Sequence, residues 1–125
     1  MPERFNLWDR FKSFRYAFSG LKVLLTTQHN ARIHGAASVL VIGAGLFFRL
    51  NRMEWCWIIL AIVSVWTAEV FNTALEFLAD AVHPEEHPLV GKAKDAAAGA
   101  VLLSAFGAVL IGLLILGPYV LRFFQ

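Results

Sequence analysis

Five polar residues share one face of a segment that is otherwise apolar enough to cross a membrane: Glu69, Asn72, Thr73, Glu76 and Asp80. On a helical wheel they fall within about 100° of one another, and we call this face the polar stripe. A charged group at membrane depth costs roughly 2.5–3.5 kcal/mol on insertion scales. Three carboxylates on one face therefore predict a catalytic or transport site that faces a bundle interior or water.

Position along the polar stripe suggests different chemistry for its members. Glu76 and Asp80 lie nearer the end of the helix, where carboxylate oxygens can hold Mg²⁺ together with phosphate oxygens. Glu69 lies about 10 Å deeper, where a carboxylate removed from water can act as a general base toward a lipid hydroxyl. Asn72 can hold a substrate oxygen or a metal-bound oxygen. From the residues alone, a structural polar network and a proton or cation pathway stay open as alternatives.

The composition argues against a soluble domain. Of the 125 residues 58% are hydrophobic and 16% are charged, whereas soluble chains average about 25% charged residues. The single cysteine, Cys56, excludes an internal disulfide. We therefore expect one membrane domain and no nucleic-acid partner.

Three apolar runs are candidates for membrane spans, because a bilayer core of about 30 Å needs about 20 helical residues. We expect an all-α protein with one domain over residues 1–125. Its predicted parts are an interfacial helix (1–31), three transmembrane helices (32–50, 54–82 and 95–122) and a cytoplasmic loop (83–94).

The N-terminal segment has the pattern of an amphipathic helix. Phe11, Phe14, Phe18, Leu21 and Leu25 recur at spacings of three and four, and most charged residues lie outside that face. An aromatic face beside a basic face is typical of a helix that lies at the membrane surface. The alternative is a helix packed against a protein core.

The basic residues predict the orientation in the membrane. With three spans, eight lysines and arginines lie on the side of the N-terminus and the 83–94 loop, against three on the other side. Because positive residues favour the cytoplasmic side, we expect the N-terminus and the outer end of the polar stripe to face the cytoplasm.

The loop before the third span contains further candidates. Pro84, Pro88 and Gly91 are expected to end the second helix and to delay the next. Asp95 would then cap the third span. Lys94 beside it is a cation at a helix N-terminus, which predicts an anionic partner and makes a phosphate site plausible.

Other known signatures are weak or absent. His83 and His87 are spaced for metal ligation, but the prolines beside them favour a solvated loop. The sequence contains no G-x-x-x-x-G-K-[ST] motif and no protein-kinase signature. In the third span a small residue recurs every four positions, which favours close helix packing and predicts a homo-oligomer. These small residues are Ala96, Ala100, Ser104, Ala108 and Gly112.

Three motifs resemble those of the prokaryotic diacylglycerol kinase and undecaprenol kinase family. Residues 69–80, E-V-F-N-T-A-L-E-F-L-A-D, are similar to its E-x-x-N-[ST]-A-[IL]-E-x-x-x-D hallmark. Residues 94–102 resemble its K-D-x-x-A-G-A-V-L segment, and residues 30–34 resemble its N-x-R-I-H element. The resemblance implies a homotrimeric helical bundle in a bacterial cytoplasmic membrane, which transfers the γ-phosphoryl group of MgATP to a lipid alcohol.

The resemblance also implies roles for individual residues. Glu69 would be the catalytic base, Asn72 and Thr73 would position substrate and phosphate, and Glu76 would hold Mg²⁺. The residues that would contact the nucleotide are Arg10, Tyr16, Glu76, Asp80, Lys94 and Asp95.

One position departs from the family pattern. The family often has a glutamate metal ligand just before the N-x-R-I-H element, whereas this chain has Gln28. Gln28 is kept as a neutral candidate metal ligand. The acceptor is expected to be undecaprenol or diacylglycerol, with undecaprenol slightly favoured. The alternative function is a small oligomeric transporter or a proton or cation channel that uses Glu69 and Glu76.

Overall fold

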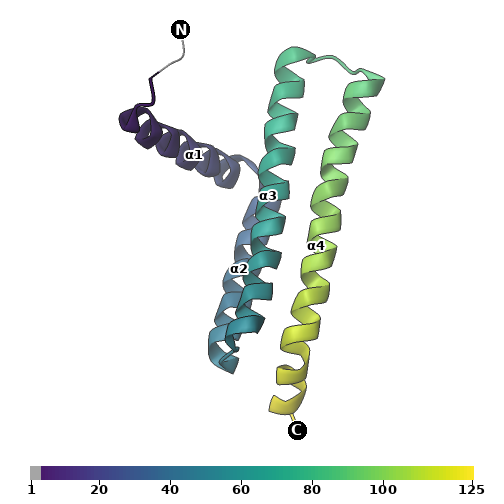
Figure 1. Ribbon diagram of the computed structural model, residues 1–125. Helices are drawn as coiled ribbons and strands as arrows, with labels where there is room; N and C mark the ends of the chain where they lie inside the picture. Colours follow the sequence, from purple (N-terminus) through teal and green to yellow (C-terminus); the bar gives the residue numbers. More distant parts are fainter. Residues whose placement is uncertain (1–3) are drawn as a thin grey trace.

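The computed structural model describes residues 4–125, and within them it contains four helices and no strand. The helices are α1 (Leu7–Thr27), α2 (His29–Phe48), α3 (Arg52–Val82) and α4 (Pro88–Phe123). In Figure 1, α3 and α4 run antiparallel side by side, α2 lies along the lower part of α3, and α1 projects away from this bundle. The expected all-α fold, with an N-terminal surface helix and three long apolar helices, is confirmed.

An elbow at Gln28 joins α1 to α2. Gln28 has an extended backbone that ends one helix and precedes the next, so the break comes earlier than the expected boundary at residues 31 and 32. The Arg32 guanidinium donates hydrogen bonds to the carbonyls of Leu25 and Thr26, at 3.1 and 2.9 Å. These bonds satisfy carbonyl groups that the end of α1 leaves free, and they fix the direction of α1.

The turn between α2 and α3 is also defined by local chemistry. Arg49 adopts a left-handed conformation with φ of 55° and ends α2. Asn51 and Glu54 form a reciprocal capping box that starts α3. Gly45 allows a close approach here, because a Cβ atom on it would lie 2.7 Å from the Trp55 ring.

The start of α4 corrects the sequence prediction. The prolines were expected to delay this helix until residue 95, but α4 begins at Pro88, so that the loop covers only residues 83–87. Proline suits the first turn of a helix, where its missing N–H is not needed. The His87 ring caps the helix by accepting the Leu89 backbone N–H at 3.1 Å. The prediction that Asp95 caps this helix is therefore wrong.

Two of the three long helices, α3 and α4, are longer than a membrane span requires. Three helices, α2, α3 and α4, are long and apolar enough to span a membrane. With 20 residues α2 is about 30 Å long, whereas α3 and α4, with 31 and 36 residues, are about 46 and 54 Å long. Figure 1 shows that α3 and α4 extend past the start of α2 at the loop end.

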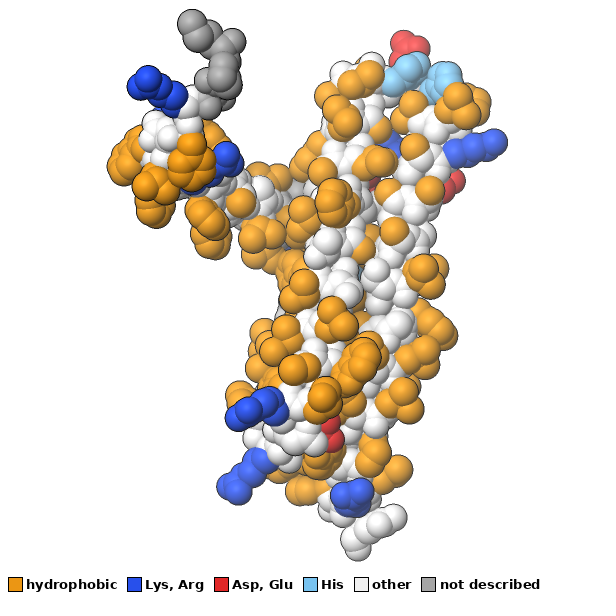
Figure 2. Space-filling view, viewed as in Figure 1, with side chains coloured by type: hydrophobic (Ala, Val, Ile, Leu, Met, Phe, Trp, Pro, Cys, Tyr) orange, Lys and Arg blue, Asp and Glu red, His pale blue; other side chains and the backbone are white. Residues whose placement is uncertain are grey.

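The apolar face of α1 is open. Phe11, Phe14 and Phe18 are exposed, and hydrophobic side chains gather along the lower edge of this helix in Figure 2. Figure 1 shows that α1 leaves the bundle near the start of α2, the first of the long apolar helices. This arrangement is the one expected for a helix at the membrane surface.

The opposite end of the bundle is held by aromatic and polar contacts. The rings of Phe48 and Tyr119 stack at 5.7 Å, and Phe123 lies edge-on to Phe47 and Phe48. The Tyr119 hydroxyl contacts both carboxylate oxygens of Glu54, at 2.9 and 3.1 Å. These contacts join α2, α3 and α4 far from the polar stripe.

Candidate functional site

The polar stripe runs from the buried part of α3 to its exposed end. Glu69, Thr73 and Asn72 have exposed fractions of 1%, 4% and 9%, whereas Glu76 is half-buried and Asp80 is exposed. Three buried atoms, Glu69 Oε2, Asn72 Oδ1 and Thr73 Oγ1, have no hydrogen-bond partner within the described chain. A buried polar atom without a partner costs about 1–3 kcal/mol. All three lie on one face of α3 and are available to accept or donate a hydrogen bond.

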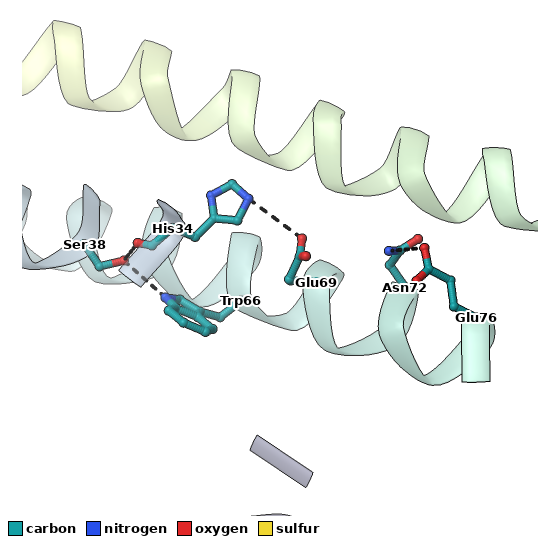
Figure 3. Close-up of polar contacts among 6 residues, drawn as sticks. All are labelled: His34, Ser38, Trp66, Glu69, Asn72 and Glu76. Atoms are coloured by element: carbon teal, nitrogen blue, oxygen red, sulfur yellow. Dashed lines mark hydrogen bonds and ion pairs between the residues drawn. The ribbon is translucent and has the colours of Figure 1, made fainter. Parts of the chain in front are cut away.

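Glu69 faces a residue that the motif analysis did not assign to the site. His34 Nε2 on α2 lies 3.8 Å from Glu69 Oε2, and the two side chains point toward each other in Figure 3. The Ser38 hydroxyl donates to the His34 carbonyl at 2.7 Å, and Trp66 Nε1 donates to Ser38 Oγ at 3.1 Å. One signal for His34 was in the sequence, because it is the only ionisable residue in the apolar run 33–48.

Asn72 and Glu76 form the middle of the site. Asn72 Nδ2 donates to Glu76 Oε1 at 3.2 Å, across one helical turn (Figure 3). This bond uses the amide nitrogen and leaves the buried Oδ1 free to accept. An amide oxygen beside a carboxylate is a donor set that suits Mg²⁺, which prefers hard oxygen ligands and takes its others from water and phosphate.

The other candidate metal ligands are few. Within residues 4–125 no group of three or more His, Cys, Asp and Glu side chains is arranged to hold a metal ion. Gln28 lies at the elbow between α1 and α2 and is half-buried. Its side chain forms no hydrogen bond to the polar stripe in the described structure.

Lys94 has the anionic partner that its position predicted, but this partner belongs to the chain itself. The Lys94 ammonium forms an ion pair with the Asp80 carboxylate across α3 and α4. Both side chains are at least one-third exposed, and an exposed pair of this kind contributes only about 0–1 kcal/mol. A phosphate group can therefore compete for Lys94. Asp95, the next residue, is exposed on α4.

Two candidate nucleotide contacts lie away from the stripe within one chain. Arg10 and Tyr16 are on α1, about 27 and 18 Å from Gln28 along the helix axis. The Arg10 guanidinium lies 5.6 Å from the Phe5 ring centroid, and the Tyr16 side chain is exposed. A single chain does not bring them to Glu76 or Lys94.

The depth of each residue follows from the pairing of α2 with α3. His34 lies five residues after the start of α2, so Glu69 opposite it lies about 7.5 Å below the level at which α1 leaves the bundle. The rise along α3 then brings Glu76 about 3 Å above that level and Asp80 about 9 Å above it. The polar stripe thus crosses the expected membrane surface.

An apolar groove adjoins the buried end of the stripe. It has a volume of about 690 Å³ and lies between α2, α3 and α4. His34 is the only titratable residue among those that line it. The groove can hold a hydrocarbon chain with its polar end near His34 and Glu69.

A second, more polar pocket of about 570 Å³ lies over the loop. Asp80, Glu85, Glu86 and Lys94 line it. The rings of His83 and His87 lie 5.0 Å apart there. Both histidines have structural roles, because His83 ends α3 and His87 caps α4.

Comparison with known proteins adds independent findings. The family model described as prokaryotic diacylglycerol kinase matches residues 15–116. The undecaprenol kinase of Bacillus subtilis is 41% identical over 108 residues, which cover 86% of this chain and 88% of that protein. The diacylglycerol kinase of Synechocystis is 40% identical over 122 residues, covering 94% and 70%. That of Escherichia coli K12 is 27% identical over 99 residues, covering 79% and 81%.

Proposed function

The chain belongs to the prokaryotic diacylglycerol kinase family and is an ATP-dependent membrane lipid kinase, and we propose that its acceptor is undecaprenol or diacylglycerol. Undecaprenol is favoured because the undecaprenol kinase relative aligns over most of both chains. The observation that carries the proposed mechanism is the buried carboxylate of Glu69. Its Oε2 lacks a hydrogen-bond partner in the described structure and faces His34, which lines an apolar groove.

In this mechanism Glu69 is the general base. Its carboxylate takes the proton of the lipid hydroxyl as the hydroxyl oxygen attacks the γ-phosphorus of ATP. The bond from the γ-phosphorus to the bridging oxygen breaks, and ADP leaves. Since phosphoryl transfer passes through a loose transition state, positioning and charge neutralisation supply most of the catalysis.

The middle of the stripe would hold the metal. Asn72 Oδ1 and the Glu76 carboxylate are the candidate ligands, with Gln28 as a further, neutral one. A Mg²⁺ ion held by these residues would supply positive charge that offsets the charge of the phosphate groups. The Thr73 hydroxyl, which is buried without a partner, would donate to a phosphate or substrate oxygen.

The exposed end would bind the rest of the nucleotide. Lys94 would exchange its contact with Asp80 for a phosphate oxygen, because a weak exposed pair is readily replaced. Asp80, thus released, and Asp95 would contact the nucleotide at this end.

We further propose a homotrimer in a bacterial cytoplasmic membrane, with α1 and the 83–87 loop on the cytoplasmic side. Arg10 and Tyr16 do not reach the stripe of their own chain, so that α1 of a neighbouring copy would supply them. The extensive apolar surface of α4, on which Val101 is the only buried residue in the structure described, provides area for contact with copies and with lipid.

The apolar groove would hold the hydrocarbon of the acceptor. A hydroxyl group at the His34 end of the groove would lie near Glu69. The relatives are named kinases, and this favours lipid phosphorylation over a proton or cation channel.

The test is a phosphorylation assay with purified protein. Labelled ATP, Mg²⁺ and either undecaprenol or diacylglycerol are incubated with the wild type and with Glu69→Gln. We expect a labelled lipid phosphate from the wild type, with the larger kcat/KM for undecaprenol. If the wild type phosphorylates neither alcohol, the proposal is contradicted.

A further inference from the structure

The Glu69 carboxylate faces His34 through one of its two oxygens. Oε2 is fully buried and has no hydrogen-bond partner in the described structure. His34 Nε2 faces Oε2 at 3.8 Å, which is within ion-pair range and longer than a hydrogen bond. The contact thus leaves the other oxygen, Oε1, available to take a proton.

A second contact joins the same two helices one turn away from the His34–Glu69 pair. Trp66, one turn before Glu69, donates to Ser38, one turn after His34, at 3.1 Å. Gly35 packs against the Trp66 ring, since a Cβ atom there would lie 3.7 Å from it. Ser38 and Trp66 fix the register of α2 against α3, while His34 and Glu69 remain unbonded one turn nearer the site.

Resting on the proposed function, we propose that His34 is a positioning residue for the lipid phosphorylation reaction. Its Nε2–H donates to Glu69 Oε2 when substrate is bound, and this orients Oε1 toward the lipid hydroxyl. The present separation is consistent with such a role, because hydrogen bonds in active sites are often long without substrate and shorten in the reactive complex. Ser38 and Trp66 hold His34 at the correct level.

The geometry of the ring allows a sharp test. The amide nitrogen of glutamine can occupy the position of histidine Nε2, whereas that of asparagine matches Nδ1 and falls short. We therefore expect His34→Gln to retain much of kcat. His34→Asn and His34→Ala should each lower kcat by about 10- to 100-fold, because a misplacement of about 1 Å can cost about 100-fold. The KM for ATP should stay unchanged, since His34 lies below the nucleotide end of the stripe.

A double-mutant cycle shows whether His34 acts through Glu69. In Glu69→Gln there is no carboxylate for His34 to orient. Adding His34→Ala to that variant should therefore cause no further loss of kcat. The matched control is His29→Ala, which removes an exposed histidine from the same helix and should leave kcat unchanged. Circular dichroism and size-exclusion chromatography confirm that each variant is folded.

Each outcome decides the proposal. Equal activity of the Gln and Asn variants, or wild-type kcat in His34→Ala, would overturn it. If Glu69→Gln is inactive while the His34 variants are unaffected, only this inference fails. If Glu69→Gln itself retains full activity, the proposed base fails and the positioning role fails with it.

Discussion

Replacing Glu69 with glutamine separates catalysis from stability. The substitution keeps the shape of the side chain and removes only its charge and its capacity to accept a proton. If Glu69 is the general base, kcat should fall by about 10²- to 10⁴-fold, which corresponds to about 2.7–5.4 kcal/mol in activation free energy. Binding of ATP should be retained, because the nucleotide end of the stripe lies about two turns away.

The same substitution should not destabilise the protein. Glu69 is 1% exposed, and its Oε2 has no partner in the described structure, so that the carboxylate contributes little to folding and is costly to bury. A neutral amide removes part of that cost. We therefore expect the Tm of Glu69→Gln, measured by circular dichroism in detergent, to equal or exceed that of the wild type.

Glu54→Gln is the matched control at the opposite end. Glu54 accepts from the Tyr119 hydroxyl and from the Asn51 backbone N–H. Losing these charge-assisted bonds should cost about 1–3 kcal/mol of stability and lower the Tm, with kcat within about twofold of wild type. Wild-type kcat in Glu69→Gln, or a fall in Tm like that of Glu54→Gln, would refute the reasoning and favour a structural polar network.

Three further predictions concern the rest of the site. Glu76→Gln should raise the Mg²⁺ concentration needed for half-maximal activity, whereas Gln28→Glu should preserve or lower that concentration. An unchanged Mg²⁺ titration for Glu76→Gln would count against metal ligation by Glu76. Lys94→Ala should raise the KM for ATP by about tenfold, because it removes one charge-assisted contact of about 1.4 kcal/mol. The control is Lys92→Ala, which removes an exposed lysine two residues away and should leave the KM unchanged. Equal effects of the two substitutions would argue against a specific phosphate contact. Val41→Trp should narrow the apolar groove and raise the KM for the lipid alone. An unchanged lipid KM would show that the hydrocarbon binds elsewhere.

The polar stripe and the long helices could be predicted because they depend on local periodicity. Residues at spacings of three and four share a helix face whatever the tertiary structure, so the grouping of Glu69, Asn72 and Glu76 followed from the sequence. The same periodicity identified the amphipathic α1 from its phenylalanines. Neither prediction needed knowledge of how the helices pack.

The start of α4 was not predicted correctly, because proline can either end a helix or occupy its first turn. Pro88 was interpreted as a helix breaker, but at the first position of a helix proline is favoured. The deciding feature was His87, which is an uncommon cap and supplies Nδ1 to the Leu89 N–H. The consequence was that Asp95 received a capping role that it does not have.

Contacts between helices could not be deduced from spacing alone. The His34–Glu69 pair joins residues on α2 and α3, and the Lys94–Asp80 pair joins α4 to α3. The first pair depends on the register set by the Arg49 turn and the Ser38–Trp66 bond, and the second depends on the 83–87 loop between α3 and α4. The sequence indicated that Lys94 needs an anion, but it did not identify the Asp80 carboxylate as that anion.

The distribution of satisfied and unsatisfied groups separates the two ends of the bundle. At the far end, Glu54 is paired with Tyr119, and the aromatic rings of Phe48 and Phe123 pack around the same contact. At the site end, three buried polar atoms of the described chain have no partner. Directional contacts at the far end join the three long helices, whereas the polar atoms of the stripe are left available for the ligands that we propose. A substitution that satisfied Asn72 Oδ1 or Thr73 Oγ1 within the chain should therefore stabilise the fold and, if these atoms contact the ligands as proposed, impair catalysis.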